Sequence, residues 1–209
     1  MDSRTTSPPL GRRERNKQRV RERLYSAAVE LFVEKGYDHT SIDEIAERAD
    51  VARGTFFNYF QRKEDIISAW GERRRTALMT GLDAKGASHP GSIAQLQQCM
   101  AVLVRINEEE PQLTTAMLTA WVKAGRPILE EPYAAEVFAR IIESGVHQGE
   151  LSPGMPPISV GNVLRDVYLG ALYRWAHHPS DGSLDEELQQ ILRLLLDGMT
   201  AKATSAPAR

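Results

Sequence analysis

The sequence contains little of what marks secreted or membrane proteins. A single cysteine, Cys99, excludes an internal disulfide. No apolar run approaches the roughly 20 residues that a membrane-spanning helix needs. The opening residues are basic, but no hydrophobic segment follows them, so we expect no signal peptide. These absences predict a cytoplasmic protein without a membrane partner.

Recognisable catalytic and metal-binding patterns are also missing. The sequence has no phosphate-cradling glycine loop, no nucleophile elbow and no zinc-ligand spacing. His177 and His178 adjoin the end of an expected helix, where a cation is favoured by the helix dipole, and no further ligand pattern accompanies them. We therefore predict a protein that is not an enzyme, with no catalytic residue, no metal and no cofactor.

Charge is present but unevenly distributed along the 209 residues. Residues 1–80 hold 16 Lys and Arg against 13 Asp and Glu, whereas residues 81–209 hold 10 against 15. Seven of the early cations fall within twelve residues, and they are Arg12, Arg13, Arg15, Lys17, Arg19, Arg21 and Arg23. Such a cluster indicates a polyanionic partner, although a solvated start of a helix has the same composition.

Apolar spacing predicts helices throughout the chain. An apolar stripe marks a first helix at about 13–35, Ser41 and Glu44 form a capping box for a short second helix, and a third is expected at about 52–59. A longer helix from Lys63 and a linker at 84–91 follow, and then come segments at about 92–107, 112–123, 132–148, 157–178 and 184–202. No segment shows sustained strand alternation. The pattern predicts an all-α protein, with an N-terminal three-helix helix-turn-helix domain and a larger helical domain behind it.

The stretch "VARGTFFNYF" at 51–60 is unusual because it mixes three phenylalanines with small polar residues. On a helix, Phe56 and Phe60 share one face, and Gly54 and Asn58 lie opposite them. Arginine and asparagine match guanine and adenine edges in the major groove, and threonine can contact a thymine methyl. The sequence therefore predicts a buried aromatic side and an exposed side that reads DNA, formed by Arg53, Gly54, Thr55 and Asn58. An aromatic corner of a helical core remains the alternative.

The run from "AAVELF" through "TSIDEIAERADVARGTFFNYFQRKEDII" resembles the DNA-binding domain of the TetR family of bacterial transcriptional regulators. The resemblance implies a flexible basic arm at 1–17, a DNA-binding domain at 18–78 with its helix-turn-helix at about 41–60, and a ligand-binding and dimerisation domain at 79–209 with a disordered tail. It further implies that Thr40 and Ser41 hold phosphate and that Tyr59 and Lys63 clamp the DNA backbone. Four residues depart from the family pattern and put individual contacts in doubt: Asp50, Ala52, Phe57 and Arg62.

The C-terminal half is expected to bind a ligand and a second subunit. The resemblance implies a ligand cavity in this region, and bulky residues there fit an apolar pocket for an apolar or aromatic small molecule, with ordinary core packing as the alternative; the pocket candidates are Met100, Leu103, Met117, Trp121, Phe138 and Tyr168. Two further apolar stripes mark the last two helices, and the resemblance implies that these helices form a homodimer interface, unless both stripes are buried within one subunit; its candidates are Val167, Ala171, Trp175, Leu188, Leu192 and Leu195.

We therefore predict a repressor that a small molecule releases from a palindromic double-stranded DNA operator. A transcriptional activator, and a helical module that no longer reads DNA, are the alternatives.

Overall fold

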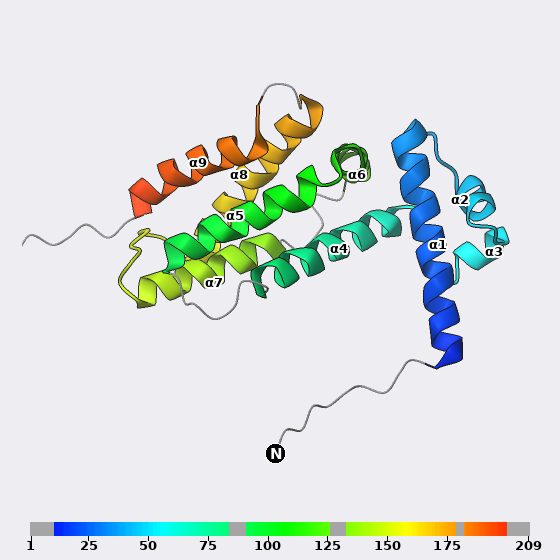
Figure 1. Cartoon of the computed structure of the whole chain (residues 1–209), viewed down its shortest axis with the longest axis horizontal. Helices are drawn as coiled ribbons and strands as arrows, with labels where there is room; N and C mark the ends of the chain where they lie inside the picture. The colour runs from blue at the N-terminus through cyan, green and yellow to red at the C-terminus, as the bar shows by residue number, and fades with distance from the viewer. Residues whose placement is uncertain (1–10, 84–90, 126–132, 179–181, 200–209) are drawn as a thin grey trace, which may run out of the picture.

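The computed structural model describes residues 11–83, 91–125, 133–178 and 182–199, and the regular elements of these residues are nine α-helices (Figure 1). They are α1 (Arg12–Lys35), α2 (Ile42–Arg48), α3 (Arg53–Phe56), α4 (Glu64–Asp83), α5 (Ser92–Glu108), α6 (Pro111–Lys123), α7 (Tyr133–His147), α8 (Pro157–His177) and α9 (Leu184–Met199). The all-α prediction is confirmed.

Two predicted boundaries need correction. Residues 12–17, placed in a flexible arm by the family resemblance, form the first turns of α1, in line with the helix that the apolar stripe predicted from about 13, because no proline or glycine interrupts the helical run after Gly11. The third helix has four residues instead of about eight, and the chain continues from it in turns. Residues 1–10 of the predicted arm, most of the linker and the tail at 200–209 lie outside the described residues.

The first three helices form the head, which we define as residues 11–63. Its core contains Leu24, Ala28 and Phe32 from α1, Ile45 from α2 and Phe56 from α3, all of them essentially without solvent contact. The head has one contiguous apolar interior, and its short α2 and α3 depend on this burial because isolated helices of such length are unstable.

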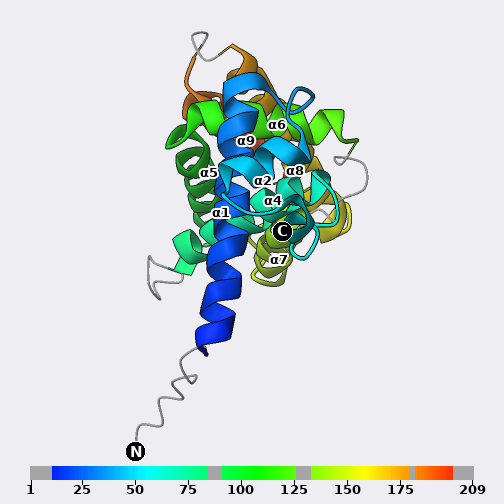
Figure 2. The ribbon, with the colours of Figure 1, turned by 90° about the vertical axis from the view of Figure 1, so that its right-hand side faces the viewer.

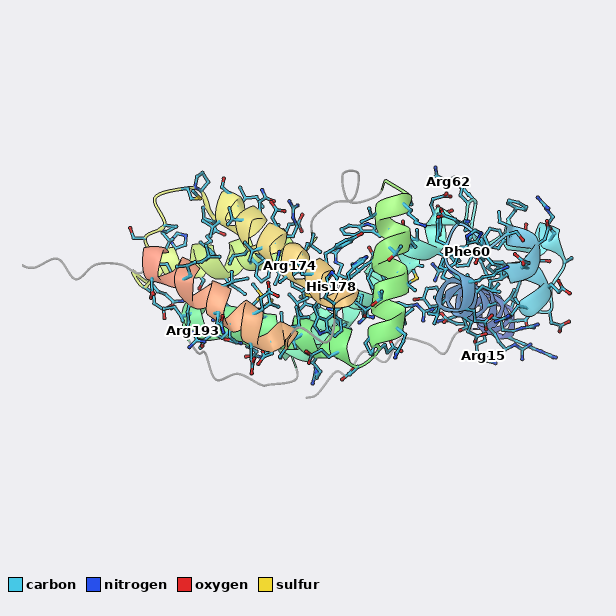
Figure 3. All side chains as sticks on the ribbon, turned by 90° about the horizontal axis from the view of Figure 1, so that it is seen from above. Arg15, Phe60, Arg62, Arg174, His178 and Arg193 are labelled. Atoms are coloured by element: carbon cyan, nitrogen blue, oxygen red, sulfur yellow. The ribbon has the colours of Figure 1, made fainter. Side chains whose placement is uncertain are left out.

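Helices α4 and α6 join the head to the body, which we define as α5 to α9. In Figure 1, α4 leaves the head and runs along α5. Helix α6 packs against α1 and α4, and Figure 3 shows it between the head and the other helices of the body. The Lys123 ammonium on α6 pairs with the Asp38 carboxylate, and the Arg73 guanidinium on α4 lies 3.6 Å from the centre of the Tyr25 ring. Because α6 contacts the head directly, a movement of α6 would act on the head.

The body is built on a close pair of helices, α7 and α8. A Cβ atom added at Gly161 would lie 2.3 Å from the carbonyl oxygen of Ala135, so only glycine permits this approach. Helix α9 covers α5 and α8 with one apolar stripe, which contains Leu184, Leu188, Leu192 and Leu196.

A buried chain of hydrogen bonds crosses from α4 into the body. The Arg74 guanidinium donates to the Ile106 carbonyl and, over 3.1 Å, to the Thr114 hydroxyl. Thr114 donates to the carbonyl of Asn107, whose side-chain amide donates to the Tyr168 hydroxyl at 2.9 Å. Four helices thus share one polar network, which fixes α4 relative to α5, α6 and α8.

Candidate nucleic-acid interface

The aromatic residues of the 51–60 stretch anchor it from behind. Phe56 and Phe60 are buried, with ring centroids 5.7 Å apart, and the Arg21 guanidinium of α1 lies 5.2 Å from the centre of the Phe60 ring. Figure 3 shows Phe60 beside α1 and Arg62 at the edge of the head. Gly54 and Asn58 are exposed, as the helical projection predicted.

The recognition segment, which we define as residues 53–58, consists of α3 and the start of the turn that follows it. Asn58 N–H donates to the Thr55 carbonyl and Tyr59 N–H donates to the Phe56 carbonyl, so Asn58 stands in a tight turn just after α3. No side chain caps α3, in agreement with the departure at Ala52. An atom added at the Cβ position of Gly54 would have no neighbour within 4 Å, so this side of α3 is open.

Arg23 of α1 holds the turn before α3, a role that its place in the basic cluster did not indicate. Asp50 has a φ of 50°, so its backbone is in the left-handed conformation. The TetR family pattern has glycine at this position. The Arg23 guanidinium donates to the carbonyls of Ala49 and Asp50 and pairs with the Asp50 carboxylate at 3.1 Å. Because Arg23 is 27 positions from Asp50, only tertiary structure reveals this clamp.

Arg53 is paired with an acidic residue of α2. Its Nη1 donates to both oxygens of the Asp43 carboxylate, at 2.7 and 2.5 Å, and both side chains are 61% exposed. No periodic pattern links these positions, so no local signal indicated the pair. The Arg53 guanidinium is therefore exposed, and its positive charge is already paired with the Asp43 carboxylate.

Thr40 and Ser41 have different environments. Thr40 is 3% exposed and its hydroxyl donates to the Gly36 carbonyl at 2.9 Å, so this hydroxyl is bonded inside the head. Ser41 is exposed and forms the predicted capping box, in which Glu44 N–H donates to Ser41 Oγ and Ser41 N–H donates to Glu44 Oε2. The Lys35 ammonium, together with Ser41, lowers the pKa of Glu44 to about 2.

Lys63 has a structural role as well as the predicted contact with DNA. Its ammonium donates to the carbonyls of Tyr37 and Thr40, at 2.6 and 2.9 Å, and lies 4.0 Å from the centre of the Tyr37 ring. Partial burial lowers the pKa of Lys63. An ammonium has three protons, so one donor of Lys63 remains for an outside acceptor.

The first turns of α1 extend the basic surface beside the recognition segment. They project beyond the other described helices of the head, as Figure 2 shows, and their cations are exposed. A hollow of about 560 Å³ joins the two surfaces, lined by Arg13, Glu14, Asn16 and Lys17 from α1 together with Asn58 and Tyr59. The polar groups that could contact bases are thus next to a concentration of positive charge.

Comparison with known proteins decides the family. Residues 24–70 match the family described as "Bacterial regulatory proteins, tetR family", and residues 91–198 match "TetR/AcrR family transcriptional repressors, C-terminal domain". The chain belongs to the TetR/AcrR family. Its members are DNA-binding transcriptional regulators and not enzymes, so the predictions of a helix-turn-helix repressor with a ligand-binding domain and without catalytic activity are confirmed.

Two relatives cover most of this TetR/AcrR chain. The structure of FadR from Thermus thermophilus, a TetR-family repressor in complex with lauroyl-CoA, superposes with a TM-score of 0.73 and 31% identity, over 90% of this chain and 100% of FadR. The transcriptional repressor KstR of Rhodococcus jostii is 27% identical over 180 residues, which are 84% of this chain and 82% of KstR.

The predicted pocket residues fall into two groups. Met100, Leu103, Met117, Phe138 and Tyr168 are buried in the body, on α5 to α8. Trp121 is only partly buried and lines an open apolar hollow of about 670 Å³ whose other lining residues are Val122, Leu169, Gly170, Tyr173, Arg174, His177 and His178. The structure thus separates Trp121 from the other five candidates.

The residues predicted for a dimer interface fall into two groups by their burial in the single chain. Ala171, Leu188 and Leu192 are buried within the single chain, because their stripes pack into its own core. Val167, Trp175 and Leu195 keep partial exposure. Among the α9 side chains at 184–198, Leu194 is the most exposed large apolar one, at 74%.

None of the described helices combines the length and apolar character that crossing a bilayer would require.

Proposed function

We propose that this repressor reads its operator with the recognition segment, using Arg53, Gly54, Thr55 and Asn58. The carrying observation is that Arg53, Gly54 and Asn58 are exposed and Thr55 is half-buried beside them, while Phe56 and Phe60 fix the segment from the buried side. Asn58 offers the paired donor and acceptor that adenine requires, and Gly54 allows the backbone to approach the groove closely.

The surrounding groups are suited to the phosphate backbone. Ser41, the Tyr59 hydroxyl and the remaining donor of Lys63 surround the recognition segment, and the basic first turns of α1 extend it across the hollow that Asn58 and Tyr59 line. Phosphate contacts fix the position of a protein on DNA without reading sequence. We assign these residues the positioning role and place the protein in the bacterial cytoplasm, where it meets DNA.

Selection from random duplex DNA tests this proposal. The parent protein is expected to enrich one sequence motif, and Asn58→Ala to lose the preference at one base pair per half-site, with about 5- to 150-fold weaker binding, corresponding to ~1–3 kcal/mol. Gln97→Ala, an exposed change on α5, is the matched control and should select the parent motif. Enrichment of no motif by the parent protein would contradict the proposal.

We also propose that two copies associate through the outer faces of α8 and α9. Val163 and Leu194 are exposed on these helices, Val167 and Leu195 are partly exposed, and the Arg174 guanidinium on α8 pairs with the Glu187 carboxylate on α9. Figure 3 shows both helices along one side of the body, away from the head. A two-fold dimer of this kind fits a palindromic operator.

Sedimentation of a charged variant tests the dimer. Leu194→Asp should shift the protein from dimer to monomer at micromolar concentration, because a desolvated carboxylate in an apolar interface is strongly unfavourable. Val33→Asp places the same change on an exposed position of α1 and should leave the association unchanged. A parent protein that sediments as a monomer would contradict the proposed dimer.

For the ligand we propose a long-chain acyl-CoA, bound with its chain between α5, α6, α7 and α8. The support is the 31% identical FadR, whose structure holds lauroyl-CoA, together with the buried apolar side chains of Met100, Met117 and Phe138. Methionine adapts to irregular apolar shapes, which suits a region that must open for a chain.

Release from DNA follows from the position of α6. Met117 faces the body core while α6 packs on α1, so a chain inserted beside Met117 displaces the helix on which the head rests. The ligand then favours a conformation in which the heads no longer match the operator.

Titration with lauroyl-CoA tests the ligand. Lauroyl-CoA should raise the melting temperature and weaken operator binding, whereas free CoA should do neither. If acyl-CoAs of short, medium and long chain length all leave operator affinity unchanged, the acyl-CoA proposal is wrong.

A further inference from the structure

We propose that Asp43 is a positioning residue that makes Arg53 read a base instead of binding a phosphate. The proposal rests on the proposed DNA-reading function of the recognition segment. It concerns a residue of α2 that lies outside that segment and is acidic, a charge that by itself is unfavourable beside DNA.

The geometry fixes one edge of the Arg53 guanidinium and leaves others available. Nη1 donates to both oxygens of Asp43, at 2.7 and 2.5 Å, which holds this corner of the guanidinium beside α2. A guanidinium has five N–H donors, so Nη2 and Nε retain the paired donors that the O6 and N7 atoms of guanine accept. Asp43 is the second residue of α2 and Arg53 the first of α3, so the pair bridges the two helices of the helix-turn-helix.

Electrostatics explains why the pair favours a base. An arginine without a partner at the edge of a groove can turn to the nearest phosphate, which carries a negative charge that a base edge lacks and is present whatever the base sequence. The Asp43 carboxylate matches the cation and repels the full negative charge of a phosphate far more strongly than the uncharged acceptor edge of guanine. The pair therefore converts a contact that would be independent of sequence into one that discriminates between bases.

The salt dependence of binding distinguishes these two states. A matched pair releases few counterions from DNA, whereas an arginine that neutralises one phosphate steepens the slope of log affinity against log salt by about 0.9. Removing Asp43 should therefore steepen the slope by about this amount and raise the affinity for unrelated DNA several-fold, while the preference at one base pair is lost.

The experiment compares Asp43→Ala, Asp43→Asn and Arg53→Ala with the parent protein, in selection from random duplex DNA and in salt titrations. Glu47→Ala is the matched control, because it removes an exposed carboxylate from the same helix. We expect Asp43→Ala and Arg53→Ala to lose preference at the same base pair, and Asp43→Asn to show a weaker form of the same loss. Glu47→Ala should keep the parent motif.

The outcomes separate the two proposals. If the parent enriches no motif, the DNA-reading function itself fails. If the parent enriches a motif that Asp43→Ala and Asp43→Asn both retain at every base pair, only the role of Asp43 is overturned. It is equally overturned if Arg53→Ala retains the full motif, since Asp43 acts through Arg53. Melting curves of the exposed variants confirm that each is folded.

Discussion

Replacing Lys63 with methionine tests whether this residue holds the head together in addition to contacting DNA. The substitution keeps most of the length and apolar character of the side chain and removes the ammonium. The carbonyls of Tyr37 and Thr40, which accept from Lys63 at 2.6 and 2.9 Å, lose this donor.

The expected destabilisation is about 2 kcal/mol. A hydrogen bond to a charged group contributes about 1.5–3 kcal/mol to stability, so two such bonds added together would exceed the destabilisation of about 2 kcal/mol. Lys63 is only partly buried, so water screens the charge and can reach the released carbonyls, which reduces the sum. For a chain of this size about 2 kcal/mol corresponds to a melting temperature lower by roughly 4–8 °C.

Thermal unfolding followed by circular dichroism measures this effect, with Arg62→Met as the matched control. Arg62 is the preceding residue and carries the same charge, but its side chain is 64% exposed and its nearest carboxylate, that of Asp65, is 3.9 Å away. Arg62→Met should therefore change the melting temperature by less than about 2 °C. Equal melting temperatures for Lys63→Met and the parent would refute the structural role, and the effect of Lys63 on DNA binding could then be interpreted as a phosphate contact alone.

Three further outcomes follow from the structure. Gly161→Ala should destabilise the protein by about 1–3 kcal/mol in chemical denaturation, because the new methyl group overlaps the Ala135 carbonyl of α7; an unchanged midpoint would contradict the close packing. The pKa of Glu44 is about 2 in the folded protein and 4.5 as its ordinary value, so its contribution to stability is complete above pH 4.5 and is lost as the pH falls toward 2. Glu44→Gln should flatten the acid-unfolding curve in that window, and a curve parallel to that of the parent would show that the Lys35 contact is not formed. Burial raises the pKa of the Cys99 thiol to about 12, so a thiol reagent should label Cys99 only as fast as the protein opens, and rapid labelling of the native protein would contradict this burial.

The sequence predicted the helices of the body well because their apolar stripes are long and end at proline or glycine. Helix α8 begins at Pro157 and ends at His177, as the breaks on either side indicated. The capping box of Ser41 and Glu44 also placed the start of α2 correctly, because a capping box involves only residues close together in the sequence.

Features that depend on tertiary contacts could not be predicted in this way. The pairing of Arg53 with Asp43 and the clamp of Arg23 on Asp50 join residues on different helices, and nothing in their spacing distinguishes them from other exposed charges. The predicted dimer residues Leu188 and Leu192 show the same limit, because an apolar stripe is equally suited to a partner subunit and to the core of its own chain. Only the fold decides which surface covers it.

Gly54→Leu tests the central claim, that α3 offers an open polar face to the major groove, most directly. The position is exposed, an added Cβ meets no atom within 4 Å beyond its chain neighbours and the backbone of its own helix, and leucine is favoured over glycine in a helix by up to ~1 kcal/mol, so the variant should be at least as stable as the parent. Ala101→Leu, on an exposed position of α5, controls for the added apolar surface. In a binding assay with the selected operator, we expect Gly54→Leu to be fully folded and to have lost specific binding, while Ala101→Leu binds like the parent. Operator affinity that is unchanged in folded Gly54→Leu would contradict it.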